Sequence, residues 1–203
     1  YTDGNSFSLW QNGELVGSIV EFSTIPEDPG YPEGAWHRRV YTSAAMYAGD
    51  AAEGEAVLRP LLDLGQQVTD FSGRTAYVDM QQLFDTVVPF GQHRNYWKSR
   101  YLSDLPDAAI DAMVEGNAAP PSPTTLASIW NFGGAMARVP ADATAFGDRS
   151  MPWMVSFDSI WNEAGDDDAN IAWSRTMWQR LWSRSAGDRI YLNFPGHGED
   201  ADT

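Results

Sequence analysis

The chain has 203 residues, of which 43% are hydrophobic and 13% aromatic, so it can form one globular domain with a substantial core. It has no cysteine, which excludes disulfides and thiol chemistry, and its formal net charge of −15 disfavours nucleic acid and anionic membranes as partners. No apolar run approaches the length of a membrane span. We therefore predict a single domain over residues 1–203 in the cytoplasm, with residues 1–36 only weakly patterned.

The acidity of the chain is informative about the salt environment of the protein. The 28 Asp and Glu residues face 13 Lys and Arg residues, and Lys98 is the one lysine. An Asp-rich, Lys-poor surface is typical of proteins that stay hydrated at high salt, where screening cancels self-repulsion. A GC-rich genome also favours Arg over Lys, but it does not account for so negative a charge. The composition favours a halophilic cytoplasm over that alternative.

Hydrophobic periodicity and turn residues predict the elements of the first half of the chain. In order, these are a hairpin over 7–25, a buried strand over 39–48, a helix over 51–64, a strand over 66–71 and a short helix over 77–84. Asp50 is the expected N-cap of the first helix and Gly65 its C-cap. The strand, helix and strand over 39–71 would form a β-α-β unit.

The second half is richer in strands. The predicted elements are a strand over 95–102, a helix capped by Asp104, a strand over 126–139, a strand over 152–161, a long helix over 169–185 and a last strand over 189–194. Several strand-rich intervals lack the crossover helices that parallel strands require. The pattern therefore predicts an α+β fold, with a mostly antiparallel sheet and helices packed on one face.

No catalytic motif or metal site is evident in the sequence. His37, His93 and His197 lie in scattered polar contexts, which favours solvated or locally hydrogen-bonded histidines over a metal site. The run Asp166–Asp168 directly precedes a helix, where capping and dipole effects explain it better than a bound cation. Three tryptophans share the helical spacing expected of a core: Trp173, Trp178 and Trp182.

Two short features are more specific. Glycine inside a strand, as at Gly133 and Gly134, marks either a bulge or the close approach of a flat ligand, and the sequence leaves both interpretations open. In the last predicted strand Tyr191 and Asn193 share one face. That face requires polar partners, which a cofactor edge, a substrate or plain solvent can supply.

Six segments in the same order resemble the bacterial branch of the berberine bridge enzyme-like FAD-linked oxidases, in the vanillyl-alcohol oxidase type flavoprotein superfamily. The segments are YAGDAAEGEAVLRPLLDLG (47–65), YVDMQQLFD (77–85), RNYWKSRYLSDLPDAAIDAM (94–113), GGAMARVPADATAFGDR (133–149), DDDANIAWSRTMWQRLW (166–182) and YLNF (191–194). Members combine an FAD domain with a substrate domain that contains a large antiparallel sheet. The resemblance covers about residues 40–198 and implies that this chain corresponds to the C-terminal, substrate-domain portion.

The resemblance implies flavin-dependent oxidation of an alcohol, sugar or similar small molecule, with hydride passing to FAD and O₂ then reoxidising it. It assigns the catalytic role to Tyr191, whose phenol requires a nearby positive charge or hydrogen bonds to act as a base near neutrality. The remaining expected site residues are Asn193, Gly133 and Gly134 beside the cofactor, and Trp130 and Phe132 beside the substrate.

The sequence departs from the family pattern in two ways. Ala135 and Ala137 stand where plant relatives have polar residues, so no base is available there. The FAD domain, with its attachment His and Cys, is not represented, so we expect the isolated chain to bind flavin poorly and to depend on an FAD-binding domain or subunit for activity. Two alternatives stay open, a non-catalytic small-molecule binding module and an unrelated acidic α+β protein.

Overall fold

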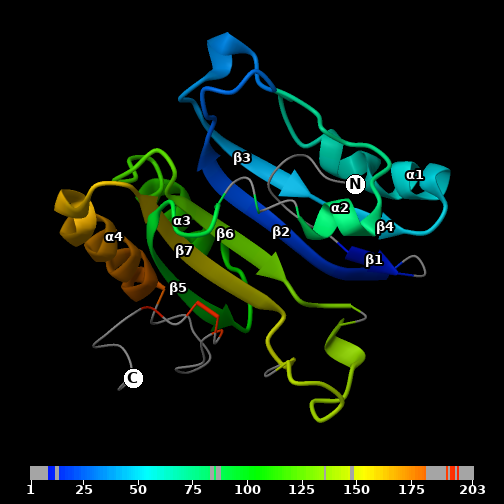
Figure 1. Ribbon diagram of the computed structural model, residues 1–203. Helices are drawn as coiled ribbons and strands as arrows, with labels where there is room; N and C mark the ends of the chain where they lie inside the picture. Colours follow the sequence, from blue (N-terminus) through cyan, green and yellow to red (C-terminus); the bar gives the residue numbers. More distant parts are fainter. Residues whose placement is uncertain are drawn as a thin grey trace.

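The computed structural model describes residues 9–11, 14–82, 85, 88–134, 136–146, 149–181, 191, 193–194 and 196. In this part of the chain seven strands form one sheet, in the order β4-β1-β2-β6-β7-β5, with β3 also paired to β2 (Figure 1). The strands are β1 (Leu9–Gln11), β2 (Glu14–Thr24), β3 (Arg39–Ala44), β4 (Met46–Ala48), β5 (Arg94–Leu102), β6 (Leu126–Asn131) and β7 (Trp153–Trp161).

Antiparallel pairing dominates the sheet. In the centre of the sheet, β2 pairs with β6, β6 with β7 and β7 with β5, and all three pairs are antiparallel. The short contact between β1 and β4 is parallel. Among the described residues four α-helices accompany the strands: α1 (Ala51–Leu62), α2 (Tyr77–Gln81), α3 (Asp107–Gly116) and α4 (Asp167–Arg180). The predicted α+β class with a mostly antiparallel sheet is confirmed.

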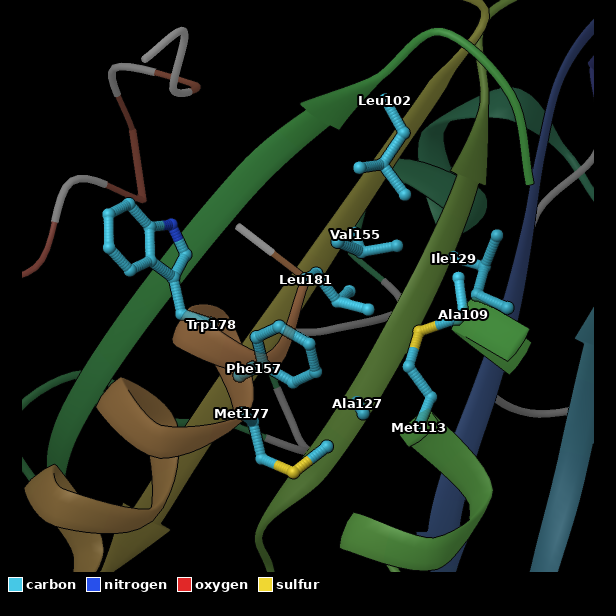
Figure 2. Close-up of a cluster of buried hydrophobic side chains, with 10 residues drawn as sticks. All are labelled: Leu102, Ala109, Met113, Ala127, Ile129, Val155, Phe157, Met177, Trp178 and Leu181. Atoms are coloured by element: carbon cyan, nitrogen blue, oxygen red, sulfur yellow. The ribbon is translucent and has the colours of Figure 1, made fainter. Parts of the chain in front are cut away.

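Helices α3 and α4 cover one face of the sheet at strands β5, β6 and β7. The main hydrophobic core lies between these helices and the sheet (Figure 2). Strand alternation turns Ala127, Val155 and Phe157 towards the helices, and all three are fully buried. From the helices, Met113 and Met177 project into the same layer. We call this side of the sheet the helix face.

Strand β5 places two cations in this layer. Lys98 and Arg100 are 3% and 1% exposed, and both lie over the ring of Trp178, at 4.2 and 3.7 Å from its centroid. Stacking on an indole offsets part of the cost of removing these charges from water. Trp178 is buried and Trp173 packs at the edge of the core, as the helical spacing predicts for these two residues.

Local signals in the sequence identify α1 correctly and its neighbours less well. Asp50 caps α1 by accepting hydrogen bonds from the backbone of Ala52 and Glu53 at 2.9 and 3.2 Å. The helix ends at Leu62 with Asp63 as its C-cap, and Gly65 lies beyond it. Residues 66–71 form no strand, so the predicted β-α-β unit is wrong.

Two further boundaries differ from the sequence prediction. The strand predicted over 39–48 is divided into β3 and β4, which pair with different strands. Helix α3 begins at Asp107 with Pro106 at the N-cap position, so Asp104 is not its cap. None of the helices in the described ranges is long and apolar enough to cross a lipid bilayer.

Candidate functional site

The sheet face opposite α3 and α4 carries a row of large aromatic side chains. Alternation from the core residues of β5 and β6 turns Trp97, Tyr101 and Trp130 to this side. The register places Trp130 in line with Met154 of β7 and Tyr101 of β5. We call this side the aromatic face.

Rings from distant parts of the chain meet on the aromatic face. Phe132, just after β6, lies 6.3 Å from both Tyr101 and Trp130, measured between ring centroids. Phe146 extends the group, with its ring 5.6 Å from that of Phe132. The predicted substrate-binding residues Trp130 and Phe132 are therefore in one aromatic cluster.

The segment that contains Tyr191 joins this cluster. The ring of Tyr191 lies 6.2 Å from Phe146 and 5.3 Å from Phe194. Phe194 in turn lies 5.1 Å from Trp97, with the two rings perpendicular, and 6.3 Å from Trp130. Edge-to-face pairs of this kind add to the energy of area burial, so the cluster helps to hold the segment on the sheet.

Tyr191, Asn193 and Phe194 belong to a turn, which corrects the prediction of a strand over 189–194. The backbone N–H of Phe194 donates to the carbonyl of Tyr191 at 2.9 Å, the spacing of a β-turn. The carbonyl of Phe194 pairs with the backbone of β5, since it accepts from Ser99 N–H at 3.1 Å. The turn allows both Tyr191 and Phe194 to contact the cluster, which strict strand alternation would not.

Ser99 anchors this turn to β5. Its Oγ accepts a hydrogen bond from the backbone N–H of Tyr191 at 3.0 Å, and it lies 3.2 Å from the carbonyl oxygen of Phe194, to which it donates. Ser99 is fully buried. Because one small hydroxyl satisfies both ends of the turn, the position of Tyr191 depends on this side chain.

The phenol of Tyr191 has a polar partner within the same turn. Asn193 Nδ2 donates to the Tyr191 oxygen at 2.8 Å, at an exposed position. This hydrogen bond fixes the orientation of the phenol relative to the turn. Tyr191 and Asn193 therefore act as a unit, and the sequence prediction that they lie on the same side is met through turn geometry.

The glycine pair follows β6 and is not inside it. The strand ends at Asn131, whose side-chain oxygen accepts from the backbone N–H of Gly133 at 2.7 Å in an Asx-turn. Gly134 has φ +62°, a conformation that favours glycine. The predicted strand over 126–139 is thus wrong beyond residue 131, and a 3-10 helix, η2 (Met136–Arg138), comes next. Ala137 lies in η2, and Ala135 lies outside the described residues.

A carboxyl group is buried under the aromatic face. Asp158 of β7 is 6% exposed, and burial raises its pKa to about 7, against the opposing effect of a hydrogen bond from Ser156 Oγ at 2.8 Å. Trp130 Nε1 donates to the same Ser156 oxygen at 3.4 Å. Trp97, the cross-strand neighbour of Asp158, has a buried Nε1 with no acceptor among the described residues. This face therefore retains an unused hydrogen-bond donor.

The other candidates from the sequence have ordinary structural roles. His37 hydrogen-bonds to Glu27 and His93 to Asn162, both at exposed positions, while His197 and Trp182 lie outside the described residues. In the Asp run, Asp167 pairs with Arg94 at 2.5 Å and accepts from Trp161 Nε1 at 2.7 Å. No group of three or more potential metal-ligating side chains occurs in the described part of the chain.

Sequence reasoning missed Ser99, Phe146 and Asp158. A serine within a strand carries no signal of its own, because its role comes from a segment that lies 92 positions later. Phe146 is in a loop without periodicity. Asp158 had a signal, because its carboxylate is the one charged group in the strand WMVSFDSIW, and a carboxylate is rarely buried without a specific reason.

Comparison with known proteins gives a consistent picture. No family model matches the sequence. The chain is 25% identical over 204 residues to an uncharacterized FAD-linked oxidoreductase, YgaK, of Bacillus subtilis, covering 93% of this chain and 40% of that protein. Among solved structures, the BBE-like protein 28 of Arabidopsis thaliana superposes with a TM-score of 0.63 at 16% identity, covering 87% of this chain and 38% of the other.

Berberine bridge enzyme from Eschscholzia californica has a similar likeness, with a TM-score of 0.60 at 16% identity over 89% of this chain and 37% of that enzyme. The chain thus spans about two-fifths of the length of the proteins it matches. Its fold, over most of its length, is that of one part of the berberine bridge enzyme-like FAD-linked oxidases, and the resemblance predicted from the sequence is confirmed.

Proposed function

We propose that the chain is the substrate-binding domain, over residues 1–203, of an FAD-dependent oxidase that acts on an alcohol, a sugar or a similar small molecule. The observation that carries this proposal is the aromatic cluster around Tyr191. Tilted and edge-to-face rings from β5, β6, the following loop and the turn around Tyr191 offer apolar surface, and Tyr191 and Asn193 place polar groups at their edge. Such a combination suits a small ligand with a hydroxyl group.

The residues present fit the ring system of a flavin better than its diphosphate. Trp97 Nε1 is a buried donor that lacks an acceptor among the described residues, and the polar edge of a flavin offers acceptors. The Gly133–Gly134 backbone would approach the ring closely, since it carries no Cβ. The sequence has no glycine-rich phosphate loop, so we assign the rest of FAD to a separate FAD-binding domain or subunit.

The proposed contribution of this chain to the reaction is binding, orientation and proton handling. FAD, when bound, accepts a hydride from the substrate and is reoxidised by O₂. Trp130 and Phe132 would hold the substrate body, and Tyr191 would take the proton of its hydroxyl group. The hydrogen bond from Asn193 supports this role because it holds the phenol oxygen in a fixed position for the proton transfer.

The test compares tyrosine variants in the enzyme completed by its flavin-binding half. We expect Tyr191→Phe to slow anaerobic bleaching of the flavin by a panel of primary alcohols and aldoses by about 10² to 10⁴-fold, the usual contribution of a general base. Tyr77→Phe, at a tyrosine that is 66% exposed, is the matched control and should leave the rate unchanged. Equal rates for both variants would remove Tyr191 from the mechanism.

The 203-residue chain alone provides a separate test of the division between domains. We expect titration with FAD to give little quenching of flavin fluorescence and no yellow protein after gel filtration. Tight binding without a partner would contradict the assignment of FAD to another domain or subunit. It would not affect the role proposed for Tyr191, which the substitution tests independently.

A further inference from the structure

A groove lies on the helix face, on the other side of the sheet from the aromatic cluster. It is a groove of about 700 Å³ between strands β2 and β3, the segment 61–69 and the end of α3. The volume is within the range of small-molecule sites in proteins. Phe22, Arg39 and Tyr41 contribute side chains from the strands.

Arg39 is the most informative residue in this groove. Its guanidinium donates to Thr24 Oγ1 at 2.5 Å, to the carbonyl of Phe22 at 3.5 Å and to the side-chain oxygen of Asn117. All three acceptors are neutral, and partial burial lowers the pKa of Arg39 below its ordinary value. A half-buried guanidinium held by neutral oxygen atoms retains its capacity to attract an anion.

The charge of the groove is opposite to that of the chain. Of the 22 residues that line it, all within the described part of the chain, two are arginines, Arg38 and Arg39, and none is Asp or Glu. Asp and Glu make up 28 of the 203 residues and outnumber the cations by more than two to one. The groove is thus a locally cationic site on a strongly acidic protein, which concentrates anions there and repels them elsewhere.

The walls of the groove are mainly apolar. Phe22, Leu61, Leu62 and Val68 provide hydrocarbon surface, and the phenol of Tyr41 lies at its edge. Gly65 brings the 61–69 segment close to this phenol, since a Cβ at that position would lie 3.0 Å from the Tyr41 oxygen. An anionic ligand that fills this space therefore needs an apolar or aromatic body as well as its charge.

We propose that this groove binds a small organic carboxylate with an apolar or aromatic body, with the carboxylate on Arg39 and the body between Phe22 and the 61–69 segment. A planar carboxylate matches the planar guanidinium, and a single half-buried cation balances its single charge. The site is separate from the aromatic face, so it does not depend on the role proposed for Tyr191. Occupation of the groove would tie β3 to the end of α3 through the ligand.

Isothermal titration calorimetry on the 203-residue chain tests the proposal, with 4-phenylbutyrate as the probe and 4-phenylbutan-1-ol as its neutral counterpart. The ionic strength is one at which the near-ultraviolet circular dichroism of the chain is intact. We expect the carboxylate to bind at least about tenfold more tightly than the alcohol, because it gains a charge-assisted hydrogen bond. Equal affinities, or no binding of 4-phenylbutyrate at millimolar concentration, would overturn the proposal.

Two isosteric variants locate the binding site without disturbing the contacts of Arg39. Gln66→Glu adds a negative charge at an exposed residue of the groove, and we expect it to weaken binding of 4-phenylbutyrate about tenfold. Gln92→Glu adds the same charge at an exposed residue away from the groove and should have little effect. The proposal is wrong if both variants bind the probe as the unchanged chain does, or if both weaken binding equally.

Discussion

The buried carboxyl of Asp158 predicts how the stability of the fold changes with pH. Burial raises its pKa from 3.8 to about 7, so the folded chain holds a proton that the unfolded chain releases. The free energy of unfolding should therefore fall as pH rises between these two values and should level off above pH 7. Asp158→Asn gives a side chain of the same shape that stays neutral throughout.

The size of the effect follows from the two pKa values. A difference from 3.8 to about 7 corresponds to about 4 kcal/mol at about 1.4 kcal/mol per tenfold change in proton affinity. The isoelectric point near 4.3 makes work below pH 5 difficult, and about 3 kcal/mol of the change falls between pH 5 and pH 8. The difference in free energy of unfolding between Asp158→Asn and the unchanged chain should therefore shift by about 3 kcal/mol in favour of the variant from pH 5 to pH 8.

Urea unfolding followed by tryptophan fluorescence at constant, high ionic strength measures this difference. The control is Asp142→Asn, which makes the same change of charge at an exposed position and accounts for the general repulsion within a chain of net charge −15. We expect the stability of the Asp142 variant to follow that of the unchanged chain at every pH. If the two variants have the same pH dependence, Asp158 is ionised in the folded state and the reasoning from burial is wrong.

Three further predictions concern the anchored turn, the core and the acidic surface. Ser99→Ala removes the acceptor of the Tyr191 N–H and should speed exchange of that amide about tenfold in NMR, whereas Ser128→Ala, a buried serine without this contact, should not. Gly116→Ala places a Cβ 1.9 Å from the sulfur of Met177 in the core. We expect the free energy of unfolding in urea to fall by about 1 to 2 kcal/mol, because overpacking outweighs the better helix propensity of alanine. Unchanged stability would show that Met177 repacks freely. We also propose that the acidic surface reflects a halophilic origin, so near-ultraviolet circular dichroism should decrease at low ionic strength, and a full signal there would contradict this interpretation.

The sequence predicted the parts of the fold that carry a local signal. Alternation identified β5 and β7 almost to the residue, and the Asp50 cap fixed the start of α1. Periodicity placed Trp178 in the core, and the absence of crossover helices indicated an antiparallel sheet. Each of these features depends on neighbours within a few positions of the chain, which is why it can be read without a structure.

The errors occurred where long-range contacts decide the conformation. Residues 66–71 were predicted to form a strand, but they form none, and residues 66–69 line the groove that contains Arg39. The apolar run after Asn131 suggested a longer β6, yet the side chain of Asn131 ends the strand in an Asx-turn with Gly133. The prediction of a strand at Tyr191 was wrong because the turn that holds this residue depends on Ser99, which is far away in sequence.

The aromatic cluster explains why the family resemblance could name the site residues but not their arrangement. The register aligns Ser128, Ser156 and Ser99 across β6, β7 and β5 on the aromatic face, in a row directly beside the larger Trp130 and Tyr101. Small side chains there leave room above the sheet, and the terminal turn fills that room, since Ser99 binds its backbone and the ring of Phe194 lies near Trp97 and Trp130.

A larger side chain in the serine row would displace the turn, and with it Tyr191, without altering any residue that the resemblance assigns to the site. The position of the proposed catalytic phenol is therefore a property of the sheet surface beneath it as much as of the Tyr-x-Asn-Phe segment. Substitutions at Ser99 should move Tyr191, whereas substitutions at Asn193 should change only the hydrogen bond to its oxygen. The two kinds of variant separate placement of the phenol from its hydrogen bond with Asn193.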